Sequence, residues 1–398
     1  MDEALRLFRE RGFDLLLADA QVMAAQADER AAGAVANPQL SASAGRSFDY
    51  DASACPGCSA TAWSVGLADP GALSDLITGK RGLRLDAARA ALEAARGSRE
   101  DALRTLSLQL RQAVLDAALQ AAQRDFAREL SDSSEQTFAL VRKRFDAGAV
   151  SEAELARVEV AALEALQQAD LADVAARAAR LQVAYLVGVR EIVPDFAIDP
   201  LLLDQPLPQA PPPVDALGEE ALSRRPDLLA ARAQARKAKA ALSLARRQRV
   251  PDVSVSAQYA REGSGNSAIQ PPTLTLGLQA ALPLFYQQQG EIARAEADVR
   301  AQELGLEKAR AQALLDVQSA RAAAEANRKL VERMRARLLQ RARRARDLVQ
   351  VQYEKGAASL LDLLDARRTW AQTHAEYLKD LHDFWLATWQ LDAAVGRT

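Results

Sequence analysis

Apolar and polar residues follow two different periods along the chain, and the two periods alternate in a fixed order. Long segments repeat apolar residues every three or four positions, which is typical of a helix with one buried face. Shorter segments alternate apolar and polar residues, which is typical of a strand with one polar face. The chain therefore predicts helix, two strands, long helix and helix, and it predicts this order twice.

Prolines, glycines and capping residues set the boundaries of these elements. The first half predicts a helix, two strands and two helices, at residues 3–32, 39–48, 61–68, 73–146 and 151–187. The second half predicts the same elements at residues 214–249, 252–261, 273–282, 286–355 and 359–395, with Pro226 interrupting the first of them. Gly148 and Gly356 end the long helices, and Ser151 and Ser359 begin the helices that follow.

The two halves keep a common register, which indicates an internal duplication. Asp14 reappears as Asp227, at 227 − 14 = 213, and the proline at 38 reappears at 251, again with 251 − 38 = 213. The glycine that ends each long helix recurs with 356 − 148 = 208. A period this long excludes a solenoid, whose repeats are about 20–50 residues. We expect a first structural repeat at residues 1–187, a proline-rich connector at 188–213 and a second repeat at 214–398.

Composition favours long helices over a globular core. The chain has 398 residues, of which 49% are hydrophobic but only 5% are aromatic. Alanine and leucine supply most of the apolar residues, and both are strong helix formers. The formal net charge of −2 gives no indication of a polyanionic partner such as nucleic acid.

Each predicted strand has one apolar face. In the second and fourth strands the apolar residues alternate with Ser, Thr, Gly and Gln, and they are Trp63, Val65, Leu67, Leu274, Leu276 and Leu278. About ten residues is the length of a tilted membrane-spanning strand. Two isolated hairpins do not form a stable sheet within one chain, whereas twelve strands from three chains close a barrel and leave no edge. We therefore expect these residues to face lipid.

The beginning of the sequence leaves two interpretations. No segment approaches the roughly 18 apolar residues of a transmembrane helix, and no signal peptide is visible. The chain is therefore either a cytosolic protein or the mature part of an exported one. Because the strands suit a membrane barrel, we expect the mature part of an exported protein.

Cys55 and Cys58 are the two cysteines, in a Cys-Pro-Gly-Cys sequence between two predicted strands. Such a pair is compatible with a redox site, half of a zinc site or a small disulfide. Further zinc ligands are absent nearby in sequence, and a redox motif normally opens a helix. We expect a disulfide at a loop tip. His374 and His382 lie two turns apart on one predicted helix, and we expect packing histidines there rather than a metal site.

The complete layout resembles the TolC-type outer-membrane efflux channels, also called outer membrane factors. Several segments in the family's order carry the resemblance, namely Arg144–Gly148, Arg225–Leu228, Val250–Val253, Leu282–Phe285, Tyr353–Gly356 and Leu361–Ala366. The stretch Leu282–Ala295 is similar to the heavy-metal (cation) efflux branch. The resemblance implies a mainly α fold with a transmembrane β part. A long coiled-coil-like α-barrel would continue into a β-barrel of four strands per chain and twelve in a trimer.

The resemblance also implies a location and partners. It implies a homotrimer in the outer membrane of a Gram-negative bacterium, extending into the periplasm. Its partners would be outer-membrane lipid, a periplasmic adaptor (membrane fusion protein) and an inner-membrane pump, and no nucleic acid. The expected function is a passive conduit that exports metal cations or drugs. A conduit needs no cofactor, bound metal or enzyme activity, and the sequence offers no nucleophile–base pair, metal cluster or phosphate loop.

By the same resemblance, a periplasmic gate lies at the start of the last helix. Asp362 and Asp365 correspond to a ring of acids around the aperture, and they share one helix face. Six carboxylates around a narrow pore favour cations and raise carboxyl pKa values by mutual repulsion. The alternative is that Asp362 only caps the helix through Ser359 and that Asp365 is solvated. Glu154 lies where the family often has an acid.

Two further expectations concern the ends of the helical hairpins. Tyr353 matches a position that helps to hold the closed state, but Ala358 stands where the family has a basic partner, so another contact must close this pore. We expect exposed tips at which an adaptor hairpin docks end-on against small residues, at Gly148, Ala149, Val150, Ser151, Gly356, Ala357, Ala358 and Ser359. The alternative is ordinary turn chemistry, in which glycine simply ends a helix.

Two other classes of protein compete with the channel. A soluble coiled-coil scaffold explains the helices but not four alternating segments in equivalent places of both halves. A periplasmic adaptor also has helical hairpins, but it carries a β-rich region that this sequence does not predict. Dependence of the purified protein on detergent separates the channel from the scaffold.

Overall fold

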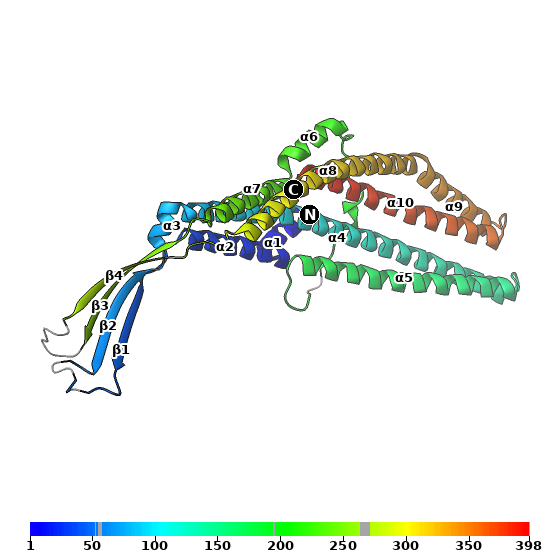
Figure 1. Ribbon diagram of the computed structural model, residues 1–398. Helices are drawn as coiled ribbons and strands as arrows, with labels where there is room; N and C mark the ends of the chain where they lie inside the picture. Colours follow the sequence, from blue (N-terminus) through cyan, green and yellow to red (C-terminus); the bar gives the residue numbers. More distant parts are fainter. Residues whose placement is uncertain (52, 55–57, 194–195, 263–270, 398) are drawn as a thin grey trace. The chain divides into compact units, whose positions relative to one another are not determined.

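The computed structural model describes residues 1–51, 53–54, 58–193, 196–262 and 271–397. Helices dominate these residues, and the predicted order of elements is confirmed (Figure 1). The chain forms two compact units. One holds Met1–Asp19, Ser98–Asp227 and Ala309–Thr398, and the other holds Ala20–Gly97 and Leu228–Lys308. Each unit therefore combines segments from both sequence repeats.

The helices and strands have the following bounds. The helices are α1 (Asp2–Arg11), α2 (Phe13–Gly33), α3 (Ala72–Thr78), α4 (Lys80–Asp146), α5 (Glu152–Leu186), α6 (Val214–Arg224), α7 (Pro226–Arg247), α8 (Gln289–Arg333), α9 (Leu339–Glu354) and α10 (Leu360–Val395). The strands are β1 (Gln39–Arg46), β2 (Thr61–Asp69), β3 (Val253–Glu262) and β4 (Thr273–Ala280).

The prediction of one unbroken first helix is wrong, because the chain turns at Gly12 between α1 and α2. Gly12 has a ψ of 122°, outside the helical region. A Cβ at this position would lie 2.6 Å from the ring of Phe8, which is buried in the core of its unit. Glycine therefore allows the turn while Phe8 stays packed.

The two long helices are also interrupted. Gly79 has a φ of 72° and ends α3, so the first long helix begins at Lys80 rather than near Leu73. The second was predicted to run unbroken to Lys355, but a π-helical turn at Met334–Leu338 separates α8 from α9. Such turns commonly mark a local insertion in a helix, and periodicity in a single sequence does not reveal them.

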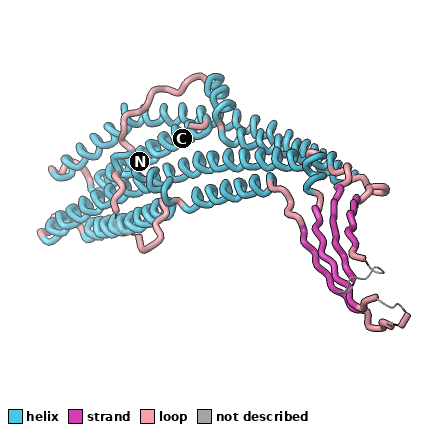
Figure 2. Tube along the Cα trace, turned by 90° about the vertical axis from the view of Figure 1, so that its left-hand side faces the viewer, coloured by secondary structure: helices cyan, strands magenta, loops and turns pink. Residues whose placement is uncertain are grey.

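Within the described residues the strands form one antiparallel sheet in the order β1-β2-β3-β4 (Figure 2). β2 from the first half pairs with β3 from the second half, so the two hairpins are not isolated as the sequence suggested. The unit that contains the sheet thus unites both repeats. In the described part of the chain, the outer sides of β1 and β4 have no strand partner.

The register separates an apolar face of the sheet from a polar one. Residues directly opposite each other share a face, and Leu40 lies opposite Leu67 while Val65 lies opposite Tyr259. Tyr259 in turn lies opposite Leu274. One face of the sheet is therefore apolar across all four strands.

Small polar side chains occupy the other face of the sheet. The hydroxyls of Ser43 and Ser64 are 2.9 Å apart, and Gln258 Nε2 donates to Ser64 Oγ at 2.8 Å. A Cβ at Gly66 would lie 2.8 Å from Ser41 Oγ, so glycine keeps this face closely packed.

In the other unit, α4 and α10 lie between α5 and α9 (Figure 1). Arg128 on α4 pairs with Asp173 on α5 at 2.6 Å. Elsewhere on α4, Asp116 accepts a hydrogen bond from His382 on α10. The guanidinium of Arg346 on α9 lies 5.1 Å from the ring centroid of Trp370 on α10. The helices therefore follow each other in the order α5, α4, α10 and α9.

Part of the proline-rich connector packs into the core of this unit. Its described residues include a short 3-10 turn at Pro200–Leu202. Leu203 is 1% exposed, and its carbonyl accepts a hydrogen bond of 2.9 Å from Nε1 of Trp385. The connector is thus anchored to the core at Leu203.

Candidate functional site

The two helical hairpins end in the same turn. Gly148 and Gly356 adopt left-handed conformations with φ of 73° and 77°. At each glycine two backbone bonds close the helix, from the glycine N–H and from the following N–H of Ala149 or Ala357. This pair of bonds is a Schellman motif, which needs a residue that tolerates positive φ. The prediction that Gly148 and Gly356 end the long helices is confirmed.

Each glycine turn leads into a capping box. Ser151 Oγ accepts from the Glu154 N–H at 3.3 Å, and Glu154 Oε2 accepts from the Ser151 N–H at 3.2 Å. Ser359 and Asp362 make the same pair of bonds at 3.2 and 3.0 Å. The boxes are equivalent in the duplication, since 359 − 151 = 208 and 362 − 154 = 208. Glu154 and Asp362 therefore have one structural role in common.

The two predicted gate acids of α10 differ in their bonding. Asp362 is exposed, and the Ser359 hydroxyl donates to its Oδ2 at 2.7 Å. Hydrogen bonds from the Ser359 side chain and backbone lower the pKa of Asp362 in the single chain. Asp365 is also exposed, one turn further along the helix. Both carboxylates thus lie on the surface near the hairpin end, and the capping role of Asp362 is real.

Tyr353 contacts residues of both hairpin ends. It is 7% exposed and packs in a cluster with Val141 and Val158 of the first hairpin and Leu360 and Leu363 of the second. The cluster buries an aromatic ring one turn from the tip. A change in the spacing of the hairpins must therefore disturb Tyr353.

Arg144 places a cation against the ring of Tyr353. Its guanidinium carbon lies 5.2 Å from the centroid of the Tyr353 ring, and its Nη2 donates to the Glu354 carbonyl at 3.3 Å. Arg144 lies in the last turn of α4, so the cation comes from the other hairpin. Arg144 belongs to the sequence motif Arg144–Gly148, which by itself indicates no role for it. The available signal was its position directly before Phe145, which is equivalent to Tyr353 in the duplication.

The predicted tip residues are mostly exposed. Val150 and Ala358 are partly buried against the Tyr353 cluster. The other six, which are Gly148, Ala149, Ser151, Gly356, Ala357 and Ser359, are exposed. The tips therefore present glycine, alanine and serine to the surroundings, with one partly buried apolar residue behind each turn.

The two histidines both pack between helices but in opposite electrostatic settings. His374 lies 4.1 Å from the ring of Phe126, and burial, assisted by Arg346, lowers its pKa to about 4. For His382 burial alone would lower the pKa, but hydrogen bonds to Asp116 at 2.6 Å and Asp383 at 2.9 Å outweigh burial and raise it. Among the described residues, no group of three or more His, Cys, Asp or Glu side chains could hold a metal ion.

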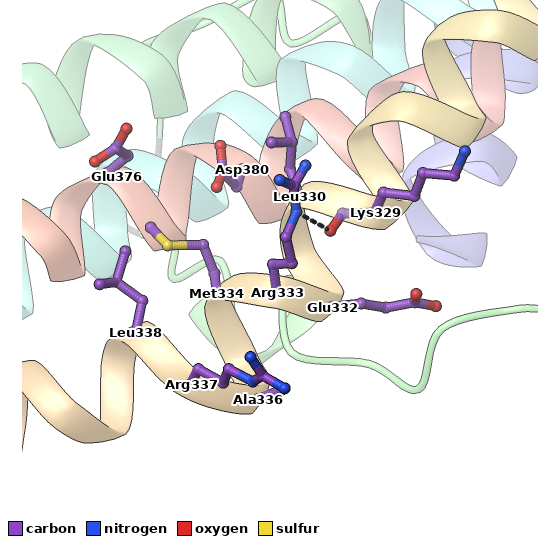
Figure 3. A pocket seen from close by; sticks show the side chains of 10 residues that line it. All are labelled: Lys329, Leu330, Glu332, Arg333, Met334, Ala336, Arg337, Leu338, Glu376 and Asp380. Carbon is purple, nitrogen blue, oxygen red and sulfur yellow. Dashed lines mark hydrogen bonds between the residues drawn. The ribbon is translucent and has the colours of Figure 1, made fainter.

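A pocket lies beside the π-helical turn, where α8 and the turn face α10 (Figure 3). Glu376 and Asp380 line it from α10, and Lys329, Arg333 and Arg337 line it from the other side. Burial, together with the neighbouring Glu376, raises the pKa of Asp380. Acidic and basic side chains are therefore mixed in the lining of this pocket.

The predicted lipid-facing residues form an exposed band on the apolar face of the sheet. Their exposed fractions range from 41% at Trp63 to 78% at Leu278. The ring of Trp63 lies 5.6 Å from that of Tyr259 on the neighbouring strand. The predicted disulfide involves Cys55, which lies outside the described residues, so the pairing with Cys58 stays a prediction. Among the described residues, no helix is long and apolar enough to cross a bilayer.

The family model described as outer membrane efflux protein matches residues 4–189 and 217–397. The chain belongs to this family. It is the outer-membrane channel component of an efflux system, as the resemblance in the sequence implied, and the family is one of channels rather than enzymes. The unmatched stretch 190–216 coincides with most of the predicted connector.

Individual members of the outer membrane efflux protein family are similar over most of the chain. The pyoverdine export outer membrane protein OpmQ of Pseudomonas aeruginosa is 30% identical over 374 residues, which cover 89% of this chain and 76% of that protein. The cobalt-zinc-cadmium resistance protein CzcC of Cupriavidus metallidurans is 24% identical over 328 residues, covering 81% and 75%.

A solved structure has the same fold. CusC, whose crystal structures concern folding and transmembrane channel formation, matches with a TM-score of 0.80. The match covers 100% of this chain and 92% of that chain at 20% identity. The helical part with a small four-stranded antiparallel sheet is therefore the fold of these efflux channels.

Proposed function

We propose that three copies of the chain close their sheets into one twelve-stranded membrane barrel and continue it as a helical tunnel in the periplasm. The observation that supports this is a sheet with an apolar and a polar face, in which the outer sides of β1 and β4 have no strand partner among the described residues. Backbone groups at an open sheet edge cannot remain unpaired in lipid. Closure by sister subunits pairs the edges and turns the apolar face outward.

The same proposal includes an adaptor and an inner-membrane pump as partners. The relatives are named for pyoverdine export and for resistance to cobalt, zinc and cadmium, so metal cations or other small compounds are the proposed cargo class. The heavy-metal branch suggested by Leu282–Ala295 remains part of this proposal. A passive conduit leaves the choice of cargo to the pump.

The proposed periplasmic gate is the ring of Asp362 and Asp365 from three subunits, with Glu154 at the equivalent position of the other hairpin. Threefold symmetry would gather six carboxylates from α10 around one axis, and such rings favour cations. The contact that holds this gate closed is Arg144 on Tyr353. It replaces the basic residue that is missing at Ala358.

The proposed docking surface for the adaptor is the pair of hairpin tips. Ala149 and Ala357 are exposed at equivalent positions, and small side chains allow another helical hairpin to approach closely. Replacing both with tryptophan is expected to abolish export in cells while the trimer stays intact. Export that persists in the double variant would contradict docking at the tips and would mean that they are ordinary turns.

Conductance in a planar bilayer tests the proposed conduit. We expect the purified protein to insert and give discrete channel openings whose cation preference falls when Asp362 and Asp365 are neutralised. A protein that inserts without conducting, or that does not insert, would contradict the proposal.

A further inference from the structure

A groove runs between the two helical hairpins, in the unit that holds α4 and α10. Side chains of α4, α5, α9 and α10 line it, and its volume is about 940 Å³. Small-molecule sites in proteins commonly have volumes of about 300–1,000 Å³. The groove therefore has room for a small molecule that touches both hairpins at once.

The charged side chains of this groove are mostly basic. The arginines are Arg157 from the first hairpin and Arg346, Arg367 and Arg368 from the second, and the glutamates are Glu129 and Glu164. The lining thus carries a net charge of +2 (4 − 2 = 2). Both glutamates are exposed, and within the described part of the chain neither forms an ion pair with one of these arginines. The positive charge of the groove is therefore not cancelled from within.

Arg367 is partly buried, and no described carboxylate lies within ion-pair distance of its guanidinium. Its Nη1 donates to the carbonyl of Ser133 at 3.4 Å, which is long for a hydrogen bond. A guanidinium has five N–H donors. This one long bond leaves donors of Arg367 available to a ligand.

A second arginine acts on the charge of Arg367. Burial and then Arg346 lower the pKa of Arg367, and they outweigh the weaker opposite effects of Glu354 and Tyr353. Burial next to a like charge disfavours the charged form of a side chain. An anion in the groove would supply the missing opposite charge.

Arg346 keeps its positive field although it has a carboxylate partner. Its side chain is 20% exposed, and its Nε donates to Asp347 at 2.8 Å. Arg346 nevertheless assists burial in lowering the pKa of His374 to about 4. The positive field therefore reaches two neighbours of Arg346 on α10.

We propose that the groove binds a small, soluble, multivalent anion that carries phosphate groups, with Arg367 as its central ligand. The paired N–H donors of arginine match the geometry of phosphate oxygens. Arg157 and Arg368 are exposed and supply further donors from the two hairpins. A multivalent anion is favoured over chloride because it can bond to several of these arginines at once.

An anion in this groove connects the two hairpins. Arg157 lies on α5 of the first hairpin, and Arg367 lies on α10 of the second. In the proposed function the ends of these hairpins surround the gate, so the bound anion is expected to lower the open probability of the pore. This effect on the pore rests on the proposed function, whereas the binding itself does not.

Isothermal titration of inorganic pyrophosphate into the purified full chain in detergent tests the site. Arg367→Gln is expected to weaken binding about tenfold or more, because hydrogen bonds between charged groups are lost. Arg368→Gln changes an exposed side chain and is expected to weaken binding several-fold. The matched control is Arg344→Gln, an exposed arginine of α9 that does not line the groove, and its affinity is expected to equal that of the wild type.

Thermal unfolding distinguishes a ligand site from a structural arginine. A ligand that binds only the folded state stabilises it, so pyrophosphate is expected to raise the midpoint of the wild type but not that of Arg367→Gln. Without the anion, Arg367→Gln is expected to unfold no earlier than the wild type, because it removes a poorly compensated charge. A lower midpoint of this variant with an unchanged affinity for pyrophosphate would assign Arg367 a structural role and overturn the site.

The remaining outcomes separate the site from the other proposals. A wild type that does not bind pyrophosphate, or that binds it no better than Arg367→Gln does, overturns the site. Tighter binding of dihexanoyl phosphatidic acid than of pyrophosphate would assign the groove to a lipid headgroup and overturn the soluble ligand. A wild type that binds pyrophosphate through Arg367 but does not conduct ions overturns the proposed function and supports the site.

Discussion

The guanidinium carbon of Arg144 lies 5.2 Å from the ring centroid of Tyr353 and so joins the ends of two hairpins that are 209 residues apart in sequence (353 − 144 = 209). The duplication does not repeat this contact. The residue equivalent to Arg144 in the second half is Gln352, since 352 − 144 = 208, and Phe145 is equivalent to Tyr353. The two hairpins thus have identical turns but different roles, because one supplies the cation and the other the ring.

Replacing Arg144 with methionine tests whether this contact holds the pore closed. A partly exposed cation–π contact is worth about 0.5–1 kcal/mol, so its loss is expected to shift the closed-to-open equilibrium roughly two- to fivefold. The measurement is the open probability of single channels in a planar bilayer.

Arg142→Met is the matched control for Arg144→Met, because Arg142 is on the same helix and lies 6.0 Å from the ring of Phe138. It is expected to leave the open probability unchanged. Equal behaviour of the two variants would remove Arg144 from the closing contact.

Neutralising Asp362 and Asp365 tests whether these acids line the pore or only cap the helix and face solvent. The double variant Asp362→Asn with Asp365→Asn keeps the side-chain shape and removes up to six charges from the proposed ring, so the cation preference of the pore is expected to fall. The reversal potential under a salt gradient measures this preference. An unchanged reversal potential would assign both acids to helix capping and solvation.

Ser359→Ala is the control for the capping role of Asp362. It removes the hydroxyl that bonds to Asp362 but leaves both charges, so it is expected to cost about 1 kcal/mol of stability and to keep the cation preference. Thermal unfolding measures the first effect, and the reversal potential measures the second. Loss of selectivity in this variant would mean that the bond to Ser359 positions the gate.

The two histidines predict opposite dependences of stability on pH. The raised pKa of His382 gives a stabilisation that is fully present below the unfolded value near 6.5 and is lost as pH rises through the folded value. The lowered pKa of His374 has the opposite effect on stability. Stability is lost as pH falls from about 6.5 to about 4, because in this range the unfolded chain binds the proton and the folded chain does not.

The thermal unfolding midpoints of two histidine variants, measured on both the acid and the alkaline side of pH 6.5, test these two dependences. His382→Gln is expected to flatten the decline of the midpoint on the alkaline side, and His374→Phe is expected to flatten the loss on the acid side. A midpoint of either variant that keeps the wild-type pH profile would contradict the assigned hydrogen bonds or burial.

The two faces of β4 predict different responses to a charge. Leu276→Arg places a cation on the face proposed to contact lipid, where it is expected to destabilise the barrel by about 2–4 kcal/mol at mid-membrane depth. Thr275→Arg places the same cation on the polar face and is expected to leave stability nearly unchanged. Resistance of each trimer to heating in detergent measures the difference, and similar losses would show that the faces are assigned wrongly.

The sequence predicted most of the helices and strands because their periods are long and their turns use specific residues. The strand ends were correct within about two residues, and Gly148, Gly356, Ser151 and Ser359 acted as predicted. The breaks at Gly12 and at Met334–Leu338 were missed. Gly12 is a possible breaker, but the turn there depends on the packing of the Phe8 ring against it. The π-helical turn is not revealed by helical periodicity in a single sequence.

The candidate site was predictable only where its chemistry is local. The capping partners Glu154 and Asp362 follow from their spacing to a serine, which is a property of one helix turn. The contact of Arg144 with Tyr353 and the bond between His382 and Asp116 join distant helices. Such pairs depend on how hairpins pack, and one sequence without structure does not determine that packing.

The mass of the particle in detergent tests the central claim most directly. The account predicts a trimer of 3 × 43.0 = 129 kDa of protein that requires detergent to stay in solution. A monodisperse particle of 43.0 kDa in detergent-free buffer, with Trp63 shielded from solvent, would contradict it.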